Sequence, residues 1–263
     1  MNLLRDAVFP LKPCDSLLIF PEGTRTRGVM LGSKTRLPLA FFCKHDIMLE
    51  SKHDIMQTIA IISQKGGAGK TTMALNMAVA SELFGQPAVI VDLDPQASAK
   101  AWHDSREDET PIVISAHASR LDDVLSVARE NGAGLTIIDT APHSESDALK
   151  AARAADLILI PCRPAVLDLR AIASTKELSD LAKTPAVAVI NAAPPRGHLA
   201  DEAAEAIRGY GLDVAPVTIA QRAAFVHSLT LGKTALEYEP KGKAAHEVKA
   251  LFMFACNHAN MKT

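Results

Sequence analysis

The sequence predicts an α/β fold, a doubly wound, mostly parallel sheet with helices on both faces. Short apolar runs rich in β-branched residues alternate with stretches of helical periodicity between residues 56 and 259. Two of these runs end in an aspartate, and the first run leads through a glycine-rich loop into a helix. Because strands that alternate with helices form parallel sheets with right-handed crossovers, the pattern predicts one layered domain.

The predicted elements follow one another regularly along the chain. Each predicted strand is a short run of mainly aliphatic residues; the strands are 58–62, 88–92, 112–114, 135–139, 157–161, 186–190 and 217–219. Each predicted helix suits a helical pattern; the helices are 73–83, 121–129, 146–155, 166–182, 199–208 and about 243–259. Residues 97–110 are polar, and no element is predicted there.

Composition limits the classes of protein that the chain can represent. Hydrophobic residues make up 48% and aromatic residues 4%, which indicates a core of aliphatic side chains. The formal net charge of −2 gives no overall attraction to nucleic acid, so a DNA partner would need a local basic patch. The four cysteines lack C-x-x-C spacing, which argues against zinc and disulfides and fits a reducing cytosol. No apolar run approaches the length of a membrane span, and no signal-peptide pattern is present.

The stretch 63–72 has the composition of a phosphate-binding loop. Its three glycines let consecutive backbone N–H groups converge on an anion, and the helix that follows directs its positive end to the same point. The lysine can reach the β- and γ-phosphates of a nucleotide, and the first threonine can ligate Mg²⁺. A glycine turn that binds nothing is the disfavoured alternative. The predicted nucleotide-binding residues are Gly66, Gly67, Ala68, Gly69, Lys70, Thr71 and Thr72.

The loop departs from the usual G-x-x-x-x-G-K-[ST] pattern because it has Gln64 in place of the first glycine and adds Lys65. Residues 65–72, K-G-G-A-G-K-T-T, resemble the deviant Walker A motif of the ParA/MinD family of ATPases. The resemblance extends from Met56 to the closing helix. It implies that Lys65 reaches across a nucleotide-sandwich dimer to the partner's phosphates, and that Lys65 and Lys70 both take part in catalysis. The alternative is that Lys65 is an ordinary solvated lysine.

Three aspartates stand at the ends of two predicted strands. The carboxyl ends of parallel strands are where ligands bind in doubly wound sheets, so we expect Asp92, Asp94 and Asp139 at the phosphate loop. The stretch 92–96, D-L-D-P-Q, resembles switch I of the ParA family, which implies that Asp94 orients the attacking water and Asp92 contributes to the Mg²⁺ site. The stretch 139–142, D-T-A-P, resembles switch II, with Asp139 as the Walker B acid that holds Mg²⁺ with Thr71. Helix capping by the two switch I acids is the alternative.

Asn191 follows the strand 186–190 and sits where the ParA family places an amide that reads the adenine edge. An amide suits that task because it donates and accepts hydrogen bonds side by side. A plain turn residue is the alternative reading of Asn191. Residues 160–164, I-P-C-R-P, resemble the family's I-P-x-x-P turn.

Residues 1–55 differ from the rest of the chain. They have no sustained period, and K-H-D-I-M at 44–48 recurs at 52–56. Residues 18–25, L-I-F-P-E-G-T-R, resemble the F-P-E-G-T-R motif of glycerophosphate acyltransferases, but no histidine precedes His45, so the general base of that family is missing. We therefore expect 1–55 to be an appended segment, from a fusion or a start-site artefact, and 56–263 to be the ATPase domain.

The resemblance implies a small plasmid-type ParA protein. Such a protein binds ATP and Mg²⁺, forms a homodimer when ATP-bound, binds DNA non-specifically in the cytoplasm at the nucleoid, and hydrolyses ATP when a ParB-type centromere-binding partner stimulates it. The candidate DNA-binding residues in the C-terminal third are Arg222, Lys233, Lys241 and Lys243, and ordinary solvated charges are the alternative.

Three other functions stay open at this point. A MinD-like membrane-cycling ATPase would need a basic amphipathic terminal helix, whereas 251–258 has few cations, so no stable membrane association is expected. A nitrogenase-reductase-like protein would need paired cysteines at a dimer axis, and only Cys162 lies near a predicted strand end. An ATPase that positions a cargo other than DNA is the third alternative.

Overall fold

The computed structural model describes residues 56–259, except for the side chains at 166, 167, 169 and 170. The appended segment predicted for 1–55, and with it the acyltransferase-like motif at 18–25, lies outside the described residues.

A parallel sheet of seven strands forms the centre of the described chain, in the order β3-β2-β4-β1-β5-β6-β7. Neighbouring strands of this sheet are parallel throughout. The strands are β1 (Gln57–Ile61), β2 (Ala88–Asp92), β3 (Ile112–Ser115), β4 (Leu135–Asp139), β5 (Leu157–Cys162), β6 (Ala186–Ile190) and β7 (Asp213–Val214). The predicted doubly wound fold is therefore confirmed.

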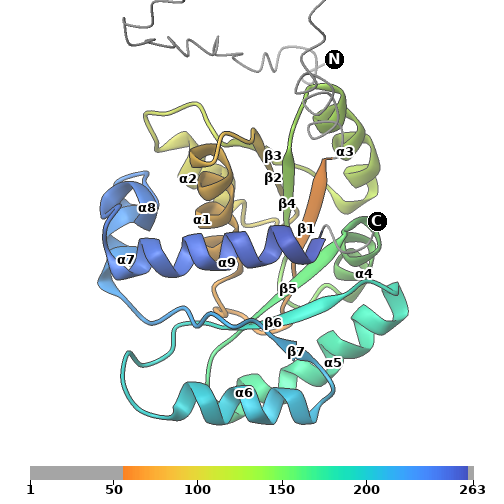
Figure 1. Ribbon diagram of the computed structural model, residues 1–263. Helices are drawn as coiled ribbons and strands as arrows, with labels where there is room; N and C mark the ends of the chain where they lie inside the picture. Colours follow the sequence, from red (N-terminus) through yellow and green to blue (C-terminus); the bar gives the residue numbers. More distant parts are fainter. Residues whose placement is uncertain (1–55, 260–263) are drawn as a thin grey trace, which may run out of the picture. The chain divides into compact units, whose positions relative to one another are not determined.

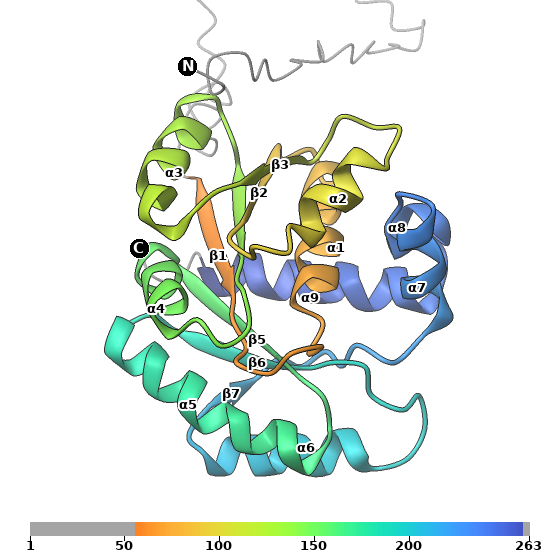
Figure 2. The same cartoon turned by 180° about the vertical axis from the view of Figure 1, so that it is seen from behind.

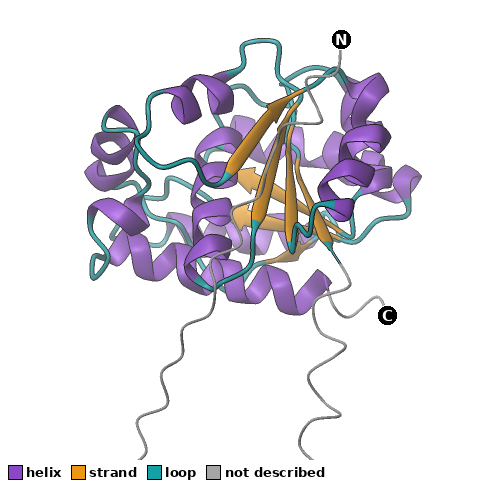
Figure 3. Cartoon of the chain, turned by 90° about the horizontal axis from the view of Figure 1, so that it is seen from above, coloured by secondary structure: helices purple, strands orange, loops and turns teal. Residues whose placement is uncertain are grey.

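Helices cover both faces of the sheet, as Figures 1 and 2 show from opposite sides and Figure 3 from above. One face carries α1 (Lys70–Leu83), α2 (Ser98–Asp104), α7 (Ala223–Thr230), α8 (Ala235–Tyr238) and α9 (Lys243–Ala259). The other carries α3 (Leu121–Glu130), which follows the short 3₁₀ turn Ala118–Arg120, together with α4 (Glu145–Ala154), α5 (Val166–Ala182) and α6 (Leu199–Gly209).

The central strands are buried because both of their faces are covered. All five residues of β2 and all five of β4 are buried, which explains why their sequences are nearly continuous apolar runs. Helix α1 packs against the sheet and against α9, and its residues from Met73 to Ser81 are buried. The apolar stripe predicted on the last helix is confirmed, since Leu251 and Phe252 of α9 belong to the core.

Two parts of the predicted element list are wrong. The polar stretch 97–110 contains α2, a helix with only two buried residues and therefore no apolar period to detect. Residues 217–219 are not a strand; the seventh strand is β7. The segment after β7 instead makes isolated backbone hydrogen bonds at the end of β6. Ile219 N donates to the carbonyl oxygen of Ile190, the last residue of β6 (2.9 Å), and Ala193 N donates to the carbonyl oxygen of Ile219 (3.1 Å). Helices α7 and α8 were not predicted as separate elements.

Candidate nucleotide-binding site

The glycine-rich loop connects β1 to α1 and has the backbone of an anion cradle. Gly67 and Gly69 have backbone φ values of +72° and +94°, which residues other than glycine rarely adopt. A Cβ atom on Gly69 would also clash with the amide nitrogen of Asn191. No side chain caps the start of α1 and its first turn holds no acid, so its free N–H groups are available to a phosphate.

Lys70, the first residue of α1, extends its side chain back to the start of the glycine-rich loop. Its side chain is buried, and Nζ donates a hydrogen bond to the carbonyl oxygen of Ser63 at 3.2 Å. Burial lowers the pKa of Lys70, and the negative charges of Asp139 and Asp94 oppose that effect. The two predicted carboxylates and the loop lysine therefore share one site, as the sequence predicted.

Asp139 is a buried carboxylate without a hydrogen-bond partner. It pairs in register with Asp92 across β4 and β2, is 1% exposed, and neither of its oxygens accepts a hydrogen bond. Burial raises the pKa of Asp139 to about 7; the Asp92 charge adds to this, and the Lys70 ammonium and the Thr71 hydroxyl offset part of it. The hydroxyl approaches Asp139 without full hydrogen-bond geometry.

An orphaned carboxylate beside a threonine hydroxyl fits Mg²⁺, which prefers oxygen ligands. Mg²⁺ usually takes one or two carboxylates, waters and phosphate oxygens instead of an all-protein cage. In keeping with this, no group of three or more histidine, cysteine or acidic side chains suited to a metal occurs among residues 56–259. Among the described residues, Asp139 and Thr71 would hold such an ion, and their role at a metal stays a prediction.

The two switch I aspartates take part in local hydrogen bonds. Asp92 accepts the N–H of Asp94 at one oxygen (3.0 Å) and the N–H of Ala99, in α2, at the other (3.1 Å). Burial raises the pKa of Asp92 and these N–H groups oppose the rise. Asp94 is half-buried and accepts the N–H of Gln96 (2.9 Å). Helix capping, the alternative open from the sequence, thus describes Asp92, whose role at the metal stays a prediction.

Lys65 forms an ion pair with a residue outside the glycine-rich loop. Its Nζ lies 3.5 Å from Oδ1 of Asp168, in the first turn of α5, and its side chain is 42% exposed. Lys65 is therefore a partly exposed lysine with one ion pair, and its role across a dimer stays a prediction. The partner was not apparent from the sequence, because Asp168 follows the loop by about one hundred residues.

A cavity of about 210 Å³ lies beside α1, next to the phosphate loop. Asn191 stands at its edge and donates a hydrogen bond from Nδ2 to the carbonyl oxygen of Ala68 (2.7 Å), so it also holds the loop in place. The role predicted for Asn191 at adenine stays a prediction. Residues that sequence reasoning did not assign to this cavity include Arg163, Gln221 and Phe225.

The four candidate DNA-binding residues have different surroundings. Arg222 lines the cavity and pairs with Glu247 of α9, with both Glu247 oxygens 3.1 Å from its Nε. The hydrogen bond to Glu247 raises the pKa of Arg222. Lys233, Lys241 and Lys243 are exposed. Arg222 thus lines the cavity with its charge paired, and the DNA-binding role of the four residues stays a prediction.

Two observations bear on the other functions. Cys162 ends β5 as a buried thiol whose pKa burial raises to about 12, so it is poorly suited to bind iron as a thiolate. The apolar stripe of α9 packs against the core. In the part of the chain that is described, no helix combines the length and hydrophobicity needed to cross a bilayer.

A glycine nest at the start of a buried helix, with a strand-end aspartate across from it, defines a P-loop nucleotide-binding domain. The chain belongs to the CobQ/CobB/MinD/ParA nucleotide binding domain family, whose model matches residues 59–234.

Comparisons with individual proteins agree with this family. The chain is 30% identical to maintenance of carboxysome distribution protein A of Gloeobacter kilaueensis over 198 residues, which cover 74% of this chain and 89% of the relative. It is 24% identical to the chromosome-partitioning ATPase Soj of Thermus thermophilus, over 78% of this chain and 96% of Soj. Septum site-determining protein MinD of Pyrococcus horikoshii, solved with Mg-ADP, superposes with a TM-score of 0.64 at 17% identity, covering 80% of this chain and 99% of MinD.

Proposed function

We propose that the chain is a ParA-type partitioning ATPase that works as an ATP-sandwich dimer. The observation that carries the proposal is the different placement of the two loop lysines. Lys70 is buried and its Nζ donates to Ser63 of its own loop, whereas the Lys65 side chain is 42% exposed and pairs with Asp168 of α5. The exposed pair with Asp168 is weak, and a partner subunit's triphosphate would supply a more highly charged anion for Lys65.

The proposed reaction is phosphoryl transfer from ATP to water, which gives ADP and phosphate. Such a reaction depends on positioning and on charge stabilisation. The backbone N–H groups of the loop hold the phosphates, Lys70 stabilises charge on the γ-phosphate, and Asp94 accepts a hydrogen bond from the attacking water. Bound Mg²⁺ would neutralise phosphate charge, and Asp139 and Thr71 would hold it. Lys65 of each subunit would stabilise the phosphates of the other.

The proposed cargo is DNA, segregated with a ParB-type partner at the nucleoid. The similarity to Soj supports this proposal. The similarity to a carboxysome distribution protein supports a second candidate, an ATPase that positions a non-DNA cargo by the same nucleotide cycle. A MinD-like membrane cycle has less support, because Leu251 and Phe252 of the terminal helix are 1% and 3% exposed and so are not available to a bilayer.

Site variants test the nucleotide cycle. Lys70→Ala should abolish ATP binding, whereas Lys65→Ala should bind ATP and lose dimerisation and hydrolysis. Lys150→Ala is a matched control, because Lys150 forms an exposed ion pair with Asp122 on the other face of the sheet. ATP binding, sedimentation velocity and phosphate release measure the three steps. Full ATPase activity in Lys65→Ala would contradict the sandwich dimer.

DNA co-sedimentation with ATP, ADP or no nucleotide tests the cargo. Binding should require ATP and should weaken steeply with salt, since each phosphate contact contributes about 0.9 to the slope of log K against log salt concentration. Replacing Lys233, Lys241 and Lys243 together by alanine should lower that slope if these lysines contact DNA phosphates. ATP-dependent dimers that bind no DNA would favour the non-DNA cargo.

The ATPase domain is proposed to comprise residues 56–263. Two features of the described chain support a start at Met56: it is 6% exposed, and its sulfur accepts a hydrogen bond from the Thr136 hydroxyl (3.1 Å). A fragment that starts at Met56 should fold and bind ATP as the full chain does. A fragment that fails to fold, measured by circular dichroism, would refute this boundary.

A further inference from the structure

Helix α2 follows the switch I loop directly and is held at its beginning by that loop. The Asp92 carboxylate accepts the N–H groups of Ala99 (3.1 Å) and Lys100 (3.3 Å). The helix has seven residues, of which only Ala99 and Trp102 are buried. Because so short a helix is not stable by itself, the contacts at its two ends decide where it lies.

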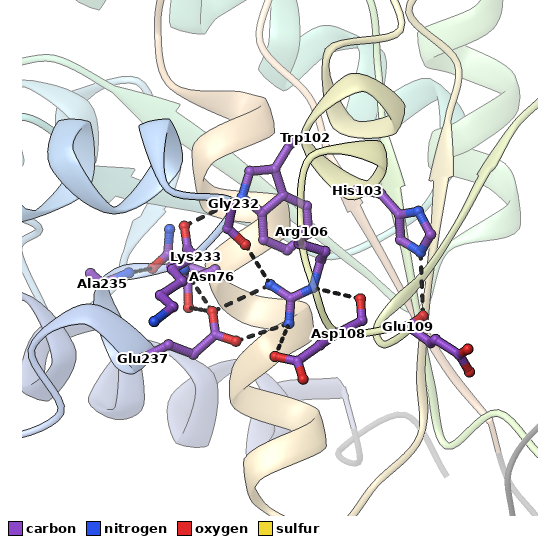
Figure 4. Close-up of polar contacts among 11 residues, drawn as sticks. Asn76, Trp102, His103, Arg106, Asp108, Glu109, Gly232, Lys233, Ala235 and Glu237 are labelled. Atoms are coloured by element: carbon purple, nitrogen blue, oxygen red, sulfur yellow. Dashed lines mark hydrogen bonds and ion pairs between the residues drawn. The ribbon is translucent and has the colours of Figure 1, made fainter.

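The end of α2 is attached to a segment more than one hundred residues away in the sequence, as Figure 4 shows. Trp102 Nε1 donates to the carbonyl oxygen of Lys233 (3.3 Å). Arg106, whose side chain is 4% exposed, donates to the carbonyl oxygen of Gly232 (3.0 Å) and pairs with Glu237 (2.9 Å). The guanidinium carbon of Arg106 also lies 4.5 Å from the centroid of the Trp102 ring. We call Trp102, Arg106 and Glu237 the α2–α8 clamp.

The segment 232–237 has little freedom to shift relative to the end of α2. A Cβ atom on Gly232 would lie 2.7 Å from the carbonyl oxygen of Ser105 and 2.8 Å from Cα of Arg106, so the two backbones are in close contact. Glu237 also closes the capping box of α8, where it accepts the N–H of Thr234 (2.7 Å). Burial alone would raise the pKa of Glu237, but hydrogen bonds from Arg106 and Thr234 outweigh it and lower the pKa, so the carboxylate is charged at neutral pH.

The same segment is also bonded to the helix of the phosphate loop. Ala235 N donates to Oδ1 of Asn76 (3.1 Å), and Nδ2 of Asn76 donates to the carbonyl oxygen of Thr72 (2.8 Å), in the first turn of α1. One short segment, 232–237, therefore contacts both α1, which begins at the glycine-rich loop, and α2 with the residues that follow it, shortly after Asp94.

We propose that the α2–α8 clamp positions Asp94 for hydrolysis and couples the nucleotide state to the surface of α7 and α8. The proposal rests on the role proposed above for Asp94. A movement of the switch I loop on binding ATP would be transmitted through α2 to Trp102 and Arg106. Trp102, Arg106 and Glu237 are positioning residues, because none of them touches the reacting atoms.

The only tryptophan of the chain lies in the clamp, so fluorescence reports on it directly. Wild-type protein with Mg²⁺ should show different Trp102 emission with ATP than with ADP, and Lys70→Ala should show no change with either. Nucleotide binding is measured separately with a fluorescent ATP analogue. Identical emission in a protein that binds both nucleotides would overturn the coupling. Failure to bind nucleotide would instead overturn the proposed function.

Steady-state kinetics test positioning. Arg106→Lys keeps the charge but loses the forked contact, so kcat should fall on the order of 10- to 100-fold while KM changes little, as expected for a misplaced catalytic group. Lys176→Ala, which removes an exposed pair with Asp180 on α5, is the matched control and should keep full kcat. Circular dichroism confirms that each variant is folded. Wild-type kcat in a folded Arg106→Lys protein would refute the positioning role. If that variant does not fold, the emission experiment still tests the coupling, because it uses wild-type protein.

Discussion

Replacing Asp139 by asparagine should stabilise the nucleotide-free protein at neutral and alkaline pH. Burial raises the pKa of the carboxyl from 3.8 to about 7. In the folded state the group keeps its proton to a higher pH than in the unfolded state, so the free energy of unfolding falls as the pH rises from about 4 to about 7. Since each pKa unit corresponds to about 1.4 kcal/mol, the carboxylate costs roughly 4 kcal/mol at pH 8. The neutral amide of asparagine avoids that cost.

Urea unfolding in the presence of a chelator measures this effect. At pH 8 the free energy of unfolding of Asp139→Asn should exceed that of the wild type by up to about 4 kcal/mol, and at pH 4 the two should nearly coincide. Asp213→Asn is the control, because Asp213 is exposed in β7. Mg·ADP should stabilise the wild type more than the variant, because the ion would bind the carboxylate. A variant that is less stable than the wild type at pH 8 would show that Asp139 is satisfied in the folded chain.

Three further predictions concern the loop and its surroundings. Gly69→Ala should abolish ATP binding and destabilise the fold by about 1–3 kcal/mol, measured by unfolding and by titration, because φ is +94° and the new Cβ meets Asn191. Arg222→Ala should raise the KM for ATP but leave DNA co-sedimentation at saturating ATP unchanged, since Arg222 lines the cavity. Loss of DNA binding with an unchanged KM would instead show that Arg222 contacts DNA. Asp168→Asn should strengthen the ATP-dependent dimer, measured by sedimentation velocity, because it releases Lys65.

Most of the fold could be predicted because its signals are local. Strands β2, β4 and β6 and helices α5 and α9 have the predicted bounds, since each is a buried run or a long helix with a readable pattern. The missed helix α2 has few apolar residues, and its position depends on Gly232 and Lys233, which are far away in the sequence. The strand predicted at 217–219 failed because an extended apolar run can bind the end of a neighbouring strand without forming a ladder.

The centre of the site could be predicted for a similar reason. The loop, Lys70 and Asp139 lie next to strand ends, and the ends of parallel strands meet at one edge of the sheet. The partners of the charged residues could not be predicted, because each pair joins separate elements. Glu247 pairs with Arg222, Asp168 pairs with Lys65, and a lone sequence shows neither pairing. The role of a lysine or arginine therefore depends on its counter-ion, which the sequence does not show.

The pair of Lys65 and Asp168 is weak enough to be exchanged for a partner subunit's phosphates. The atoms are 3.5 Å apart and the lysine side chain is 42% exposed, so solvent screens the pair and it contributes about 0–1 kcal/mol. Hydrogen bonds to a charged group contribute about 1.5–3 kcal/mol each, so phosphate contacts exceed the loss. Removing the Asp168 charge should therefore strengthen the dimer by at most about 1 kcal/mol, or about fivefold, for each Lys65. A weaker dimer in Asp168→Asn would mean that Asp168 orients Lys65 toward the partner instead of competing with it.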